Sequence, residues 1–306
     1  MVSFIMDTGI QKQKTSAILG QTVKTGIIKS NLVPMFAGLT LALYTYDINP
    51  ADKLFDILFA LIGTILVIGS AGAFNNLYDR DIDAIMERTK SRPTVTGEMN
   101  TKTALLLAIL MAVAGLTALV FTTPLAGVLG FLGLFFYVVP YTMWTKRRTI
   151  YNTEVGSISG AMPPLIGWAA MVGSIAHPAA AALFIIQVIW QMPHFYAIAI
   201  RRHDEYKAAR IPMLPVVKGV DRTYKQTNVY LVLLSATSFL FLPLSLGLTL
   251  VALLMNVGWL VLSIYGYKKN KDSEQWAKLL FIYSLIHMTI LFSTVIVYSL
   301  VGIYFL

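Results

Sequence analysis

Long apolar runs, each near the roughly 20 residues that a membrane-spanning helix needs, alternate with polar connections along the whole chain. The connections after the odd-numbered runs are short and nearly uncharged, whereas those after the second and sixth runs, residues 75–102 and 201–226, are long and charged. The pattern predicts an all-α, polytopic membrane bundle of nine transmembrane helices, formed by one domain (27–306) behind a polar N-terminal segment (1–26). The predicted helices are 27–46, 54–74, 103–121, 123–143, 154–174, 178–200, 227–246, 248–266 and 279–301.

Composition and the placement of the basic residues add an orientation. The 306 residues are 57% hydrophobic and 13% charged, which excludes a soluble domain of this size. Lysines and arginines gather in the N-terminal segment and in the connections after even-numbered helices, and Lys53 is the one base left on the other side. The positive-inside rule then places the N-terminus and both long connections in the cytoplasm, with the protein in the cell (plasma) membrane. Orientation also explains the net charge of +9, so no nucleic acid partner is expected.

The first long connection opens with an acidic cluster. Asn75, Asp79 and Asp83 are spaced i, i+4, i+8, so they share one face if the preceding helix continues, while Asp81 points to the opposite side. Carboxylates on one stripe repel unless a cation lies between them, and oxygen ligands suit a hard divalent ion such as Mg²⁺. The sequence therefore predicts a magnesium site, with a solvated acidic loop as the alternative.

The second long connection lies at the same membrane surface and carries further candidate groups. His194 lies near the end of the sixth predicted helix, and His203, Asp204 and Glu205 follow in the connection. Bases surround both connections, and acids that hold a divalent cation within a ring of bases are typical of a diphosphate site with an apolar chamber behind it for a hydrocarbon tail. The alternative is that these bases only set the orientation. The candidate diphosphate-binding bases are Arg88, Arg92, Lys146, Arg147, Arg201 and Arg202.

These residues form recognisable motifs. NxxxDxxxD, from Asn75 to Asp83 at the end of the second predicted helix, resembles the intramembrane aromatic prenyltransferases of the UbiA superfamily. The extended form DxxxDxxMxRTxxRP, which ends at Pro93, is similar to the protohaem IX farnesyltransferase (haem O synthase) branch of that superfamily. GAMPPLIGW (160–168) and WQMPHFYAIAI (190–200) support the same branch, and the resemblance covers nearly the whole chain from about residue 27.

The resemblance implies a function and a set of roles. Farnesyl would be transferred from farnesyl diphosphate to a vinyl group of haem B with addition of water, giving haem O and diphosphate, and a downstream haem A synthase is a candidate partner. His194 would face the porphyrin, either as an iron contact or as a base. Mg²⁺ would be the cofactor, with haem a substrate. The implied metal ligands are Asn75, Asp79, Asp83 and, at a second site, Asp204; the implied haem and prenyl contacts are His194, His203, Tyr196 and Trp168.

Two rival functions remain open. A prenyltransferase of the same superfamily that acts on a quinone precursor or chlorophyllide would carry a DxxxD pair after the sixth helix, where this chain has histidines instead. A membrane transporter would place ionisable groups near the bilayer midplane, whereas the acids here gather at helix ends on one side.

Overall fold

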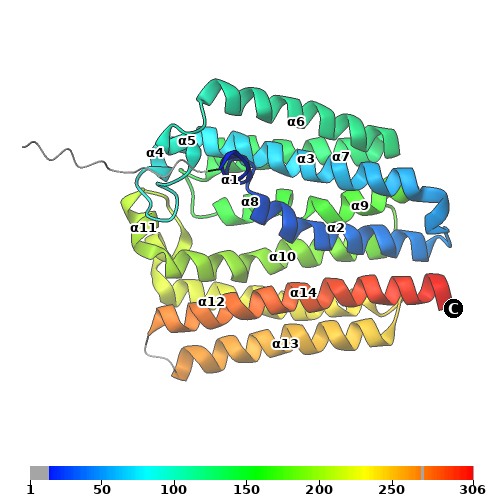
Figure 1. Ribbon diagram of the computed structural model, residues 1–306. Coiled ribbons are helices and arrows are strands. Elements are labelled where there is room, and N and C mark those ends of the chain that lie inside the picture. Colours follow the sequence, from blue (N-terminus) through cyan, green and yellow to red (C-terminus); the bar gives the residue numbers. More distant parts are fainter. Residues whose placement is uncertain (1–13, 270–271, 306) are drawn as a thin grey trace, which may run out of the picture.

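The computed structural model describes residues 14–269 and 272–305, so about half of the predicted N-terminal segment lies outside the described residues. Within the described part of the chain, nine long helical segments run roughly parallel or antiparallel in one bundle (Figure 1), which confirms the all-α membrane fold. In chain order they are α2 (Thr25–Thr45), α3 (Leu54–Tyr78), α6 (Thr101–Thr122), α7 (Pro124–Phe136) with the π-helix η2 (Tyr137–Thr145), α8 (Asn152–Gly160) with α9 (Met162–Val172), α10 (Pro178–Arg201), α12 (Leu214–Thr237), α13 (Leu246–Lys269) and α14 (Ser273–Phe305).

The short elements are confined to the ends of these helices. In the part of the chain that the structure describes, two 3₁₀ turns lie at the end of the bundle that carries few charges, and four short helices lie at or near the other end. The 3₁₀ turns are η1 (Pro50–Lys53) and η3 (Ser238–Phe241), and the short helices are α1 (Thr15–Thr22), α4 (Arg80–Asp83), α5 (Pro93–Thr96) and α11 (His203–Ala208).

The seventh long helix differs from its prediction. It begins at Leu214 rather than at residue 227, so most of the second long connection is helical. Among the residues that the structure describes, eight helices are long and apolar enough to cross a membrane by composition. Helix α12 is not one of them because its first half is rich in charged and polar residues. Gly219 interrupts that first half with φ +78°, a conformation that glycine adopts without a steric penalty.

Helices α2 and α9 pack closely against each other in the interior of the bundle. A Cβ on Gly38 of α2 would lie 1.9 Å from the Pro164 carbonyl oxygen, and one on Gly167 of α9 would lie 2.1 Å from the Met35 carbonyl oxygen. Glycine at both positions lets the two backbones touch, as small residues do between membrane helices. The helix of the fifth span breaks at Ala161, before Pro163 and Pro164, and this break faces the interior of the bundle.

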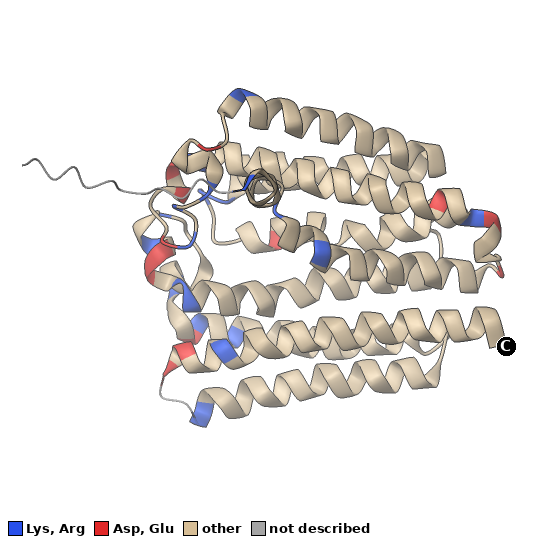
Figure 2. Ribbon diagram, viewed as in Figure 1, with Lys and Arg blue, Asp and Glu red and all other residues tan. Residues whose placement is uncertain are grey.

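Charged residues gather at one end of the bundle (Figure 2). This end, which we call the charged end, carries α4, α5 and α11, while the opposite end carries a small group around η1. The asymmetry agrees with the distribution of bases along the sequence.

Candidate active site

A cavity of about 580 Å³ opens at the charged end and extends into the bundle. Its inner wall is largely apolar, with side chains such as Val67, Leu134 and Ile166, while basic and polar side chains line its mouth. Many of the site residues predicted from the sequence line this cavity. They are Asn75, Asp83, Arg88, Arg92, Lys146, His194, Arg201 and Arg202.

The acidic stripe forms as the spacing predicts, although α3 ends at Tyr78. Asp79 N donates to Asn75 O at 2.9 Å, and Asp83 N donates to Asp79 O at 2.8 Å, so the helical path continues through the break. The stripe residues Asn75, Asp79 and Asp83 are 3%, 0% and 3% exposed. Asn75 Nδ2 donates to Asp79 Oδ2 at 2.7 Å and to Thr142 Oγ1 at 2.9 Å. The three oxygen-bearing side chains are thus buried side by side.

Each acid of the stripe is paired with a cation: Asp83 with a base of the same connection, and Asp79 with a base that follows η2. Lys146 donates to Asp79 Oδ2, and Arg92 donates to Asp83 Oδ2. Lys146 follows the π-helix η2, where its N–H bonds five residues back to the Tyr141 carbonyl at 2.9 Å. A π-turn shifts the side chains that follow it relative to an α-helix, and such turns are frequent at functional sites. Burial of the two carboxylates is compatible with folding because the cations compensate their charge.

Arg147 holds Asp81, the third acid of the cluster, away from the stripe. Its guanidinium donates to both oxygens of Asp81 at 2.7 Å, and it lies 3.5 Å from Asp79 Oδ1. These bonds hold the pKa of Asp81 below its ordinary value and raise the pKa of Arg147. The Asp81 side chain is 64% exposed, so the pair lies at the surface of the site.

Lys24 is a member of the site that sequence reasoning assigned only to the orientation of the chain. It precedes α2 in a left-handed conformation (φ 57°, ψ 57°), which is rare for a residue with a side chain. Its ammonium group lines the cavity and donates to Asn75 Oδ1. Burial, and then the charges of Arg92 and Lys146, lower the pKa of Lys24 well below its ordinary value. An ammonium therefore contacts an oxygen that the motif assigns to a metal ion.

The second long connection contributes its bases to the cavity but not its exposed acid. Asp204 is 99% exposed at its side chain and contacts His203 at 2.9 Å, and neither side chain lines the cavity. Glu205 instead bridges the two connections: Oε1 accepts from Arg202 at 2.8 Å, and Oε2 accepts from the Arg88 backbone N–H at 3.2 Å. In the described ranges 14–269 and 272–305, no group of three or more acidic or histidine side chains is arranged to hold a metal, either at Asp204 or at the stripe.

His194 faces the cavity from α10, between the mouth and the apolar wall. Its Nδ1 lies 2.7 Å from Ser284 Oγ of α14, and its ring stacks on Trp190 with centroids 4.7 Å apart. Of the two candidate histidines, only this one reaches the space that a substrate could enter.

Two further predicted contact residues lie elsewhere. Tyr196 faces α8 and α12, where its hydroxyl donates to Glu154 Oε1, and Gln226 Nε2 donates to the same carboxylate oxygen at 3.1 Å. Trp168 is fully buried near the uncharged end, where it stacks on His177 with centroids 5.4 Å apart. The prediction placed both at the cavity because they belong to motif stretches, but their helix faces point away from it.

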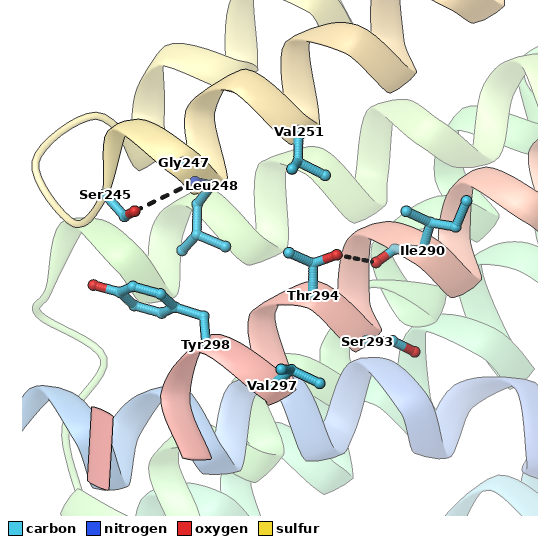
Figure 3. Close-up of a pocket in the computed structure, with 9 residues that line it drawn as sticks. All are labelled: Ser245, Gly247, Leu248, Val251, Ile290, Ser293, Thr294, Val297 and Tyr298. Carbon is cyan, nitrogen blue, oxygen red and sulfur yellow. Dashed lines mark hydrogen bonds between the residues drawn. The ribbon is translucent and has the colours of Figure 1, made fainter. Parts of the chain in front are cut away.

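A second hollow of about 600 Å³ lies between α13 and α14 near the opposite end (Figure 3). Its lining includes Leu248, Val251, Val297 and the hydroxyl of Ser245. None of its described lining residues is ionised. The two hollows are of similar size, but only the one at the charged end combines charge, polar groups and an apolar wall. We therefore assign the chemistry to that cavity.

Sequence comparison places the chain among bacterial relatives. It is 71% identical over 298 residues to a protein of Bacillus cytotoxicus named protoheme IX farnesyltransferase 1, covering 97% of each chain. It is 64% identical over 294 residues to protoheme IX farnesyltransferase 2 of Lysinibacillus sphaericus, covering 96% of this chain and 93% of the relative.

Solved structures with the same fold share little sequence with it. A digeranylgeranylglyceryl phosphate synthase superimposes with a TM-score of 0.74 at 15% identity, over 93% of this chain and 98% of the other. A UbiA homologue of Archaeoglobus fulgidus bound to DMAPP and Mg²⁺ gives a TM-score of 0.71 at 15% identity, over 94% and 99%. Residues 31–285 match the model of the UbiA prenyltransferase family. Together with the close relatives, this match shows that the chain belongs to the UbiA prenyltransferase family, in the branch of the protohaem IX farnesyltransferases.

Proposed function

We propose that the protein transfers the farnesyl group of farnesyl diphosphate to a vinyl group of protohaem IX with addition of water, giving haem O and diphosphate. The observation that carries this proposal is the buried Asn75–Asp79–Asp83 stripe with its cations, at the mouth of a cavity whose inner wall is apolar. Close relatives that carry the name of this activity over nearly their full length support the choice of substrates. By the positive-inside rule we place the charged end in the cytoplasm and the protein in the plasma membrane.

The donor set of the stripe fits Mg²⁺. Two carboxylates and one amide oxygen form a hard, oxygen-only set, and in this structure cationic side chains already contact Asn75, Asp79 and Asp83. These three residues would hold the ion, which when bound would neutralise charge on the diphosphate leaving group.

The basic side chains at the mouth would bind and orient the diphosphate. Lys24, Arg88, Arg92 and Lys146 line the cavity beside the stripe and can donate charge-assisted hydrogen bonds to phosphate oxygens. Departure of diphosphate leaves an allylic cation, and the rings of Tyr137 and Tyr141, which also line the cavity, can stabilise it through their π faces. The vinyl π pair then forms the new C–C bond, and water adds to the resulting cation and loses a proton.

Purified protein in detergent, given haem B, farnesyl diphosphate and Mg²⁺, tests the proposal. A farnesylated, hydrated haem should form together with one equivalent of diphosphate, as measured by mass spectrometry and a phosphate assay. Its absence from active preparations would overturn the proposal. Prenylation of a quinone precursor in place of haem would favour the rival acceptor, and absence of diphosphate release would favour a transporter.

A further inference from the structure

The imidazole of His194 is held on three sides. Trp190, one turn earlier on α10, stacks on one face with an interplanar angle of 18°. Phe281 of α14 stacks with its centroid 5.3 Å away and an angle of 29°. Ser284 Oγ lies 2.7 Å from Nδ1. These contacts leave the ring little freedom to rotate, and His194 is part of the cavity wall.

Ser284 also determines where the ring carries its proton. Its hydroxyl donates to the Phe281 carbonyl oxygen at 2.6 Å. A hydroxyl has one hydrogen, so towards His194 it acts as an acceptor. Nδ1 therefore carries the hydrogen of the neutral ring, and Nε2 has a free lone pair.

A lone pair at Nε2 can accept a proton or bind a metal. A base at this position would become an imidazolium, whose two N–H groups both need acceptors. Among the described residues, Ser284 is the one hydrogen-bond partner of His194, and no carboxylate contacts the ring. A neutral imidazole whose second nitrogen donates to an oxygen is instead the usual arrangement of a histidine that ligates a metal.

We propose that His194 Nε2 is an axial ligand to the iron of the haem substrate, and that Ser284 is a positioning residue that sets the tautomer and orientation of the ring. The inference rests on the proposed function, because it takes haem as the acceptor. A single ligand on α10 would fix the position of the iron relative to the diphosphate site, whose groups come from α3, the first long connection, the residue after η2 and the segment before α2. Anchoring the iron therefore sets the distance between the porphyrin edge and the allylic carbon.

Haem B binding to the full-length protein in detergent, without farnesyl diphosphate, tests the ligand directly. The wild-type protein should give the absorption and resonance Raman spectrum of histidine-ligated haem. His194→Ala should lose that spectrum, and added imidazole should restore it. His203→Ala is the matched control, since His203 lies on the surface beside Asp204, and it should leave the spectrum unchanged.

Ser284 gives a second, independent readout. Ser284→Ala should weaken haem binding about 10-fold, since loss of a partner of a metal-bound histidine has effects of this size. Ser284→Thr keeps the hydroxyl and should restore most of the affinity. In turnover, KM for haem should rise in Ser284→Ala while KM for farnesyl diphosphate stays constant.

Specific outcomes overturn the inference. An unchanged haem spectrum in His194→Ala, or no recovery with imidazole, would remove His194 as the ligand. If His194→Ala also loses farnesyl diphosphate binding, its fold is damaged and Ser284→Ala decides: unchanged haem affinity would then overturn the proposal. Failure of the proposed function looks different, because wild-type protein would then make no farnesylated haem at all.

Discussion

The two long connections at the charged end occupy equivalent places in the fold, after α3 and after α10, but they treat their acids in opposite ways. In the first, Asp79 and Asp83 are buried, and each contacts a cation from another element. In the second, Asp204 is exposed and Glu205 is used to join the two connections. Burial of a carboxylate costs free energy unless a cation pairs with it. The presence of two buried carboxylates at a cavity mouth therefore indicates a use beyond stability.

Bases of both connections line the cavity. Arg92 in the first connection is paired with Asp83, and Arg201 in the second lies 5.1 Å over the Phe281 ring. The first connection thus brings both a carboxylate and bases to the cavity, whereas the second brings Arg201 and Arg202 and no acid that lines it. The following substitutions can break or sharpen this asymmetry.

The largest effect is expected from the buried acids. Asp79→Asn and Asp83→Asn should each lower diphosphate release by about 100-fold or more, because each removes a charge that would hold the metal at the leaving group. Asp204→Asn is the matched control and should stay within about twofold of wild type, as expected for an exposed site without buried partners. Equal losses in all three variants would mean that the second connection also holds metal, and the asymmetry would be wrong.

The sequence was sufficient to predict most of the fold because apolar length is the dominant constraint in a membrane. The sequence was misleading for α12, because the first half of this helix is too polar to be predicted as part of a membrane span. That half, which includes Arg222 and Lys225, lies near the charged end and is nevertheless helical. Helix formation there depends on neighbours such as α10, which local composition does not reveal.

The site was predicted in part, for a similar reason. The stripe of Asn75, Asp79 and Asp83 follows from helical spacing alone. Lys24 could not be assigned, since its position depends on a left-handed backbone and on close packing against Gly72, where a Cβ would lie 3.3 Å from the Lys24 Cβ. Nor could the burial of Tyr196 against Glu154, 42 positions away, be read from one sequence.

Lys24 should make diphosphate binding depend on pH. Its pKa is lowered, so the ammonium form, which binds the anion, is lost as pH rises through that value. Diphosphate affinity should therefore fall with rising pH in the wild type. Lys24→Arg should shift the fall to higher pH, because guanidinium stays charged.

Lys24→Met supplies the other arm of this test. It should lower diphosphate affinity about 10-fold at low pH, the size of one charge-assisted hydrogen bond, and remove this pH dependence. Calorimetry of diphosphate binding across pH measures both effects. The same profile in Lys24→Met and wild type would assign the titration to another group.

Glu205 should matter because it joins the two long connections. Glu205→Ala releases Arg202 and the Arg88 backbone, so KM for farnesyl diphosphate should rise about threefold, corresponding to a partly exposed ion pair of about 0.7 kcal/mol. Glu87→Ala is the control, since the Glu87–Lys90 pair is exposed on the same connection and should leave KM unchanged. A KM shift in the control of equal size would show that general surface charge, rather than the bridge, sets substrate affinity.

The smallest effect is expected at Asp81, the acid that lies beside the stripe but not on it. Its pKa is below the ordinary 3.8 because Arg147 donates to it, so its contribution to stability is present above that value and is lost as pH falls through the folded-state pKa. Asp81→Asn should cost about 0.5 kcal/mol at neutral pH, little because the pair is exposed, and nothing in strong acid. Turnover should change by less than about twofold. Thermal unfolding at two pH values measures the stability, and diphosphate release measures the turnover. A loss of turnover comparable to that of Asp79→Asn would place Asp81 among the metal ligands. It would also remove the distinction between buried and exposed acids on which the site assignment depends.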